Sequence, residues 1–236
     1  MEMRCAGSST VQWLLERDNP SVRYFTLLDI MGRSPADMEV AEAKRSIIDD
    51  PRVQHGIEWM VKYQRFDDGA AKRPRGYPYD RFENCWGRHT CHMGVVKALK
   101  ALSEVPEARV SPSVERVRQD AAEYLLKHHI YRKSHDIGAI SKPEWLQFGF
   151  PLMWNTDVLE ILEILTKLGY RDSRMQDAID VANEKRTSEG NWLLDSTFNG
   201  RVIASIERKG YPSKWVTMSA IRVLKRYHGD TEDHCE

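Results

Sequence analysis

Four potential metal ligands lie close together in one stretch of the chain: Cys85, His89, Cys91 and His92. Thiolate and imidazole are ligands that zinc prefers, and three of them leave a position open for a substrate. The spacing Cys-x3-His-x-Cys-His is not a standard structural zinc spacing, and side chains adjacent on a helix diverge by about 100°. A buried cysteine, a hydrogen-bonded histidine and a helix start explain the same residues without a metal. We therefore keep zinc as the candidate cofactor, and His92 also as a candidate catalytic residue.

Asp157 is a second candidate catalytic group, at the start of the most apolar stretch of the chain. A carboxylate in the first turn of a helix is stabilised by the helix dipole and needs no catalytic role. On a helix that faces a cavity, the same group would serve as a general acid or base, or hold a cation. Both interpretations stay open.

Aromatic residues gather in the same stretches. Aromatic linings stabilise carbocations and shape isoprenoid pockets, but each ring taken singly is as well explained by packing a loop against a helix. We expect a ligand site formed by Tyr79, Trp86, Trp145, Trp154, Asn155, Trp192, Lys214 and Trp215.

Three long loops, 65–89, 130–151 and 187–212, hold most of these residues. Each is longer than the usual helix connection of roughly 2–8 residues. Capping side chains mark the helix starts between them: Asn19, Ser34, Asp50 and Ser111 before prolines, and Thr90, Thr156, Asp172 and Ser213 elsewhere. Because no strand alternation competes with the helical periodicity, we expect an all-α chain. The helices are predicted over 10–17, 20–31, 35–48, 51–64, 90–103, 112–129, 156–168, 172–186 and 213–227.

Two kinds of helix alternate along the chain. The apolar ones, 90–103, 156–168 and 213–227, suit an inner layer, and the amphipathic ones suit an outer layer. Such an alternation describes an α/α solenoid or toroid. Its outer-to-inner connections lie at one end, so that 85–92, 145–157 and 192–215 would share one rim.

Short motifs after the outer helices carry a family resemblance. Gln64 precedes Phe66-Asp67-Asp68-Gly69, and Arg186 precedes Glu189-Gly190-Asn191-Trp192. They resemble the QW-type repeat of the prenyltransferase and squalene-cyclase superfamily, the α/α toroids of terpenoid cyclases and protein prenyltransferases. The stretches 85–99, 150–159 and 212–217 are similar to bacterial and archaeal members. Helices 35–48 and 51–64 lack an inner helix between them, so we expect an incomplete α/α barrel.

The resemblance implies a single toroid-like domain over 1–229, with N-terminal hairpins over 10–48, a repeat array over 51–229 and a disordered tail over 230–236. It also implies a terpenoid-cyclase-like or prenyltransferase-like protein that handles an isoprenoid or lipid-type ligand in an aromatic-lined cavity. If it is an enzyme, it would be a transferase or isomerase. The absence of an Asp-x-Asp-Asp motif favours an alternative, a non-catalytic helical-repeat scaffold that binds a protein or peptide. The aromatic rim and the Cys/His cluster favour the first interpretation, and a second alternative is a zinc-dependent enzyme that uses this cluster.

Composition narrows the choice of partners. The chain has 236 residues, with 35 basic and 35 acidic side chains, which gives no bulk electrostatic reason to expect nucleic acid. No apolar run approaches the ~18 residues that suggest a membrane span, and residues 1–10 do not form a signal peptide. Four cysteines make a poor disulfide framework, so we expect a cytoplasmic protein with reduced thiols. The expected partners are a hydrophobic small molecule or a protein, and a homo-oligomer would cover the missing inner position.

Overall fold

The computed structural model describes residues 8–82, 85–201 and 205–229. The chain divides into two compact units, Met1–Lys62 and Tyr63–Glu236. The predicted tail, 230–236, lies outside the described residues.

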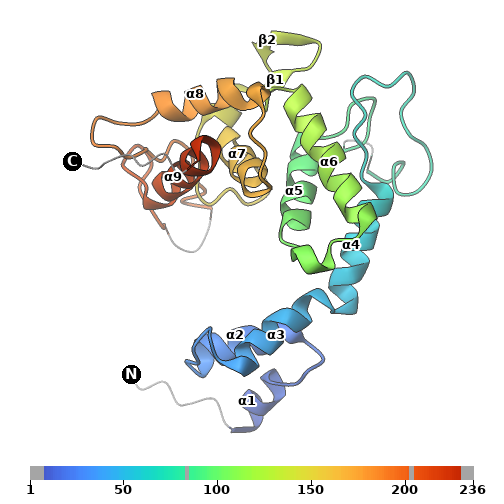
Figure 1. Ribbon diagram of the computed structural model, residues 1–236, viewed down its shortest axis with the longest axis vertical. Coiled ribbons are helices and arrows are strands. Elements are labelled where there is room, and N and C mark those ends of the chain that lie inside the picture. The colour runs from blue at the N-terminus through green and yellow to red at the C-terminus, as the bar shows by residue number, and fades with distance from the viewer. Residues whose placement is uncertain (1–7, 83–84, 202–204, 230–236) are drawn as a thin grey trace. The chain divides into compact units, whose positions relative to one another are not determined.

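The first unit is helical. They are α1 (Ser8–Leu14), α2 (Pro20–Phe25) with a π-helical turn (Thr26–Ile30), α3 (Met38–Ile48) and most of α4 (Pro51–Tyr63). α2 and α3 lie side by side around a small core of Leu27, Val40 and Ala43 (Figure 1). Asn19 caps α2, as predicted, by accepting the amide of Val22. α3 begins later than predicted, because Asp37 rather than Ser34 accepts the first free amide.

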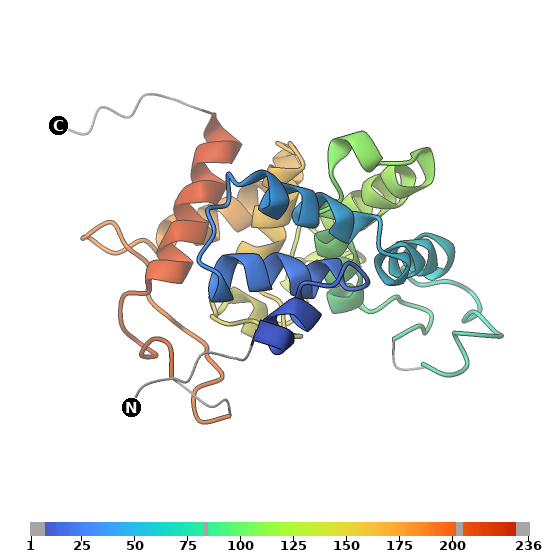
Figure 2. The same cartoon turned by 90° about the horizontal axis from the view of Figure 1, so that it is seen from below.

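The second unit holds the remaining α-helices. They are α5 (His92–Ser103), α6 (Pro112–Lys127), α7 (Val158–Lys167), α8 (Gln176–Glu184) and α9 (Lys214–His228). α7 packs against α5, α8 and α9, and α5 also packs against α6 (Figure 1, Figure 2). α7 is apolar on most sides, which explains its central position. Within the described residues, no helix is both long and apolar enough to cross a bilayer.

The expected all-α, toroid-like fold class is wrong. Strand β1 (Arg132–Lys133) pairs antiparallel with β2 (Asp136–Ile140) inside the predicted loop 130–151, so the fold is mixed. β1 is too short to show alternation, and β2 is mostly exposed and has no buried face that alternation would mark, so the hairpin has no strand signal in the sequence. His129 and Ile130 adopt positive φ values of 42° and 71°, and they turn the chain from α6 into the hairpin.

The expected assignment of helices to layers also needs correction. The segment 213–227 was expected to be an inner helix, but α9 buries only Val216, Ala220 and Val223. These three residues form one stripe, as on an ordinary amphipathic helix at a surface. Two predicted caps are shifted by one residue: Cys91 and Asp157, not Thr90 and Thr156, occupy the N-cap positions of α5 and α7. The predicted caps Ser111 and Ser213 are confirmed.

Candidate active site

A cavity of about 400 Å³ lies within the second unit, where the start of α5, the end of α6 and the hairpin meet. We call it the histidine cavity because four histidines line it. Its lining is Asp68, His89, Thr90, Cys91, His92, Met93, Tyr124, His128, Lys133, Ser134, His135, Ser141, Lys142 and Trp145.

The buried carboxylate of Asp68 organises one wall of this cavity. Lys127 Nζ lies 2.7 Å from Asp68 Oδ2, and the Ser134 hydroxyl donates to Oδ1 at 2.8 Å. The same Oδ1 lies 3.3 Å from His89 Nδ1 and 3.6 Å from His128 Nε2. Burial alone would raise the pKa of Asp68, but the hydrogen bonds from Lys127 and Ser134 outweigh burial and lower the pKa to about 2. Asp68 is therefore a carboxylate at neutral pH.

His89 is held in one tautomer by this carboxylate. Because ionised Asp68 can only accept, His89 Nδ1 carries the hydrogen, and in the neutral ring Nε2 keeps its lone pair. Backbone hydrogen bonds join the segment around Asp68 to the segment around His89. Gly69 N donates to Arg88 O at 3.0 Å, and Thr90 N donates to Asp67 O at 2.8 Å. His89 itself is exposed, so its Nε2 is open to a ligand or to water.

Cys91 lies two residues beyond His89 in the same extended segment. Alternate side chains of an extended chain lie on the same side, and both residues line the cavity. Cys91 is a partly buried free thiol at the N-cap of α5, and its side chain makes no capping hydrogen bond. The first amides of α5 therefore have no side-chain acceptor at the N-cap. They present the positive end of the helix dipole beside the Cys91 sulfur.

Two partly buried histidines, His92 and His128, also line the cavity. His92 stacks on Trp145 with ring centroids 4.4 Å apart and lies edge-on to His128 at 5.4 Å. Burial lowers the pKa of His92 to about 3, and it also lowers the pKa of His128, so both rings are neutral at pH 7. His128 Nδ1 donates to Arg132 O at 3.1 Å. The Nε2 atoms of both rings are buried without a hydrogen-bond partner in the described part of the chain.

The predicted zinc ligands are only partly brought together. His89, Cys91 and His92 line the histidine cavity, whereas Cys85 is exposed outside it. Among the described residues, no three His, Cys, Asp or Glu side chains are arranged to hold a metal ion. The geometry therefore gives the zinc interpretation no support.

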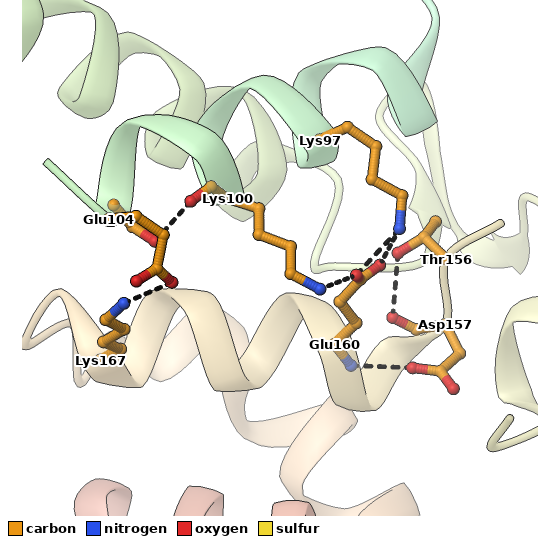
Figure 3. Close-up of polar contacts among 8 residues, drawn as sticks. Lys97, Lys100, Glu104, Thr156, Asp157, Glu160 and Lys167 are labelled. Atoms are coloured by element: carbon orange, nitrogen blue, oxygen red, sulfur yellow. Dashed lines mark hydrogen bonds and ion pairs between the residues drawn. The ribbon is translucent and has the colours of Figure 1, made fainter. Parts of the chain in front are cut away.

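Asp157 is fully buried as the N-cap of α7. Its two carboxylate oxygens accept the amides of Glu160 and Gly149, each at 2.8 Å. Burial raises the pKa of Asp157 to about 7. Figure 3 shows the neighbouring Glu160, whose carboxylate oxygens form ion pairs with Lys97 Nζ and Lys100 Nζ of α5, each at 2.7 Å. With both oxygens occupied, Asp157 is engaged as a helix cap, which is the simpler of its two interpretations.

The predicted aromatic ligand residues separate into different environments. Trp145 is buried and lines two cavities, and Trp215 lines another, stacked on Phe150 at 4.6 Å. Trp192 is 1% exposed and donates to Ala182 O, which places it in the core.

The remaining predicted residues lie in other places. Trp154 is 68% exposed, Tyr79 and Trp86 pack edge to face at 5.4 Å, and Lys214 is exposed at the start of α9. Asn155 lines a second cavity of about 630 Å³. This neighbouring cavity shares Met93, Ser141, Lys142 and Trp145 with the histidine cavity.

Sequence reasoning missed the residues around which the cavity is built. Asp68 belongs to one of the repeat motifs, and His128, near the end of the predicted helix 112–129, has no functional role in the sequence analysis. Asp68 lies shortly after the predicted outer helix 51–64 and His128 lies near the end of 112–129, where the repeats place their connections on one rim. That topology could have linked the acidic turn after helix 51–64 to the pair of histidines at the end of helix 112–129. Comparisons with protein-family models, with curated proteins and with solved structures find no match.

Proposed function

We propose that the protein is an acyl-transfer or hydrolytic enzyme that uses Cys91 as nucleophile and His89 as general base. The observation that carries this proposal is the buried carboxylate of Asp68, which holds His89 Nδ1 at 3.3 Å beside a free thiol in one cavity. A nucleophile, a base and a group that orients the base are the signature of nucleophilic catalysis. His89 and Cys91 line the same cavity, and a nucleophile and its base often come within hydrogen-bond reach only when substrate binds.

The chemistry balances with the residues present. His89 Nε2 accepts the thiol proton of Cys91 as the sulfur attacks a carbonyl carbon. The first amides of α5 stabilise the negative charge that develops on the carbonyl oxygen. The protonated His89 then donates its proton to the leaving group, which departs and leaves a thioester. Water, activated by the same histidine, hydrolyses the thioester and restores the thiol. A reducing compartment such as the cytoplasm would keep Cys91 in this form.

The terpenoid-type and scaffold interpretations stay predictions. Of the aromatic residues expected to line a hydrophobic pocket, Trp192 is in the core and Trp154 is exposed. The histidine cavity instead combines a carboxylate, histidines, lysines and a thiol, which suits polar chemistry better.

The test is acylation by p-nitrophenyl acetate, with peptide mass spectrometry to locate the acetyl group. We expect a burst of p-nitrophenol and an acetyl adduct on Cys91, while exposed Cys85 serves as the internal comparison. Cys91→Ser should abolish the burst. His89→Gln should slow acylation by roughly 100- to 10,000-fold, the usual contribution of a general base.

His55→Gln is the matched control, since His55 is an exposed histidine of the first unit. It should acylate at the wild-type rate. The proposal fails if Cys85 is acylated as fast as Cys91, or if His89→Gln behaves like His55→Gln.

A further inference from the structure

We propose that the substrate carries a negatively charged group, a carboxylate or a phosphate, which Lys133 and Lys142 bind on the hairpin side of the histidine cavity. This inference rests on the proposed function for the role of the cavity as the substrate site. It adds the chemical class of the substrate.

The charge balance of the lining supports an anion. Asp68 is the one acidic residue of the lining, and its charge is already matched by Lys127, which lies 2.7 Å away. Lys133 and Lys142 make no ion pair with the residues that the structure describes. Two uncompensated ammonium groups at the wall of a concave site raise the local concentration of anions.

The hairpin brings these two lysines to the same side of the cavity. Lys133 is the last residue of β1, and Lys142 follows β2 after Ser141, whose amide donates to Tyr131 O at 2.9 Å. Lys142 Nζ lies 5.6 Å from the centre of the Trp145 ring, the residue that borders both cavities. An anion bound here would lie at the junction between the histidine cavity and its neighbour.

Unsatisfied polar atoms provide a second indication of a ligand. His92 Nε2 and His128 Nε2 are buried without a hydrogen-bond partner in the described ranges, with Asp68 Oδ1 3.6 Å from His128 Nε2, and a buried polar atom left without a hydrogen bond destabilises the folded state. Because His128 Nδ1 donates to Arg132 O, Nε2 of the neutral ring is an acceptor, so a hydrogen-bond donor of the substrate, separate from its anionic group, would pair with it. Beyond Trp145 and Met93, the neighbouring cavity of about 630 Å³ offers room for the rest of the molecule.

The test measures binding of three small probes by calorimetry: benzoate, phenylphosphate and phenol. The Cys91→Ser variant is used, so that no chemistry accompanies binding. We expect at least one of the two anions to bind at least about tenfold more tightly than phenol, a difference of about 1.4 kcal/mol. Binding of that anion should weaken as ionic strength rises.

Substitution of the lysines then locates the site. The double variant Lys133→Gln, Lys142→Gln should bind the anion about tenfold more weakly. The matched control, Lys44→Gln with Lys209→Gln, removes two exposed lysines outside the cavity and should bind as before. Preference for benzoate identifies a carboxylate substrate, and preference for phenylphosphate identifies a phosphate substrate.

Three results would overturn the inference. They are phenol binding as tightly as both anions, no binding of any probe, or equal anion affinity in the Lys133/Lys142 variant and the control. Anion binding without acylation of Cys91 in the wild-type protein would instead reject the proposed catalytic function and leave the anion site standing.

Discussion

At the scale of single residues, the two buried aspartates of the second unit have opposite electrostatic environments. Asp68 has Lys127 and Ser134 as donors, and these keep its pKa low, at about 2. Asp157 receives backbone amides but is fully buried, and burial raises its pKa to about 7. The same side chain is thus a charged partner for His89 in one place and a helix cap in the other.

The pKa of Asp157 predicts a pH dependence of stability. Because the folded-state pKa lies above the ordinary value of 3.8, the folded state binds the proton more tightly. The contribution to stability is complete below pH 3.8 and is lost as the pH rises to about 7. The free energy of unfolding of the wild type should therefore fall relative to Asp157→Asn by roughly 1–4 kcal/mol across this window.

Urea denaturation at several pH values measures this difference. Asp120→Asn, at an exposed position on α6, is the control and should follow the wild type in parallel. A difference between wild type and Asp157→Asn that does not change with pH would show that Asp157 titrates normally.

At the scale of elements, one buried glutamate links α5 to α7. Glu160 has a side chain that is 4% exposed, and its carboxylate meets the ammonium groups of Lys97 and Lys100 (Figure 3). The pairing lets an acidic residue lie within the most apolar helix of the chain. It also fixes the packing of α7 against α5, whose first residues line the histidine cavity.

Glu160→Gln should destabilise the protein by roughly 1–3 kcal/mol, because it leaves two neighbouring lysines without a counter-charge. Glu104→Gln is the matched control. It breaks the pair with Lys167, in which the Glu104 side chain is 68% exposed, and should cost less than about 1 kcal/mol. Chemical denaturation compares the two variants, and equal losses would mean that the Glu160 pairs add no stability beyond a surface ion pair.

At the scale of the whole molecule, the first unit has apolar side chains on its surface. Trp13, Phe25, Ile30 and Met38 are each more than half exposed. α3 and α4 also follow one another with only Asp49 and Asp50 between them, as the sequence predicted. Where exposed apolar side chains gather into one patch, the patch is typical of an interface.

We therefore predict that the protein self-associates through the first unit. Analytical ultracentrifugation at micromolar concentration should detect a dimer or larger oligomer. Trp13→Ser combined with Phe25→Ser should shift the equilibrium toward monomer. Ile221→Ser, at a 51% exposed position in the second unit, should not. A strict monomer at all concentrations would contradict the prediction.

The sequence by itself determined most of the helices, because their signals are local. The side chains of Asn19, Ser111 and Ser213 each cap an amide three residues away, and α7 is recognisable from its apolar composition. Interactions this short survive any arrangement of the rest of the chain.

Only the tertiary structure decided the hairpin and the candidate site. Asp68 meets His89 and His128, which lie far along the chain, and the contact depends on how the loop, α5 and α6 pack. Tertiary packing also separated two tryptophans that look alike in sequence: Trp145 borders the cavities, whereas Trp192 fills the core. Residue type indicates which chemistry a side chain can perform, but burial and distant partners decide which side chains can act together.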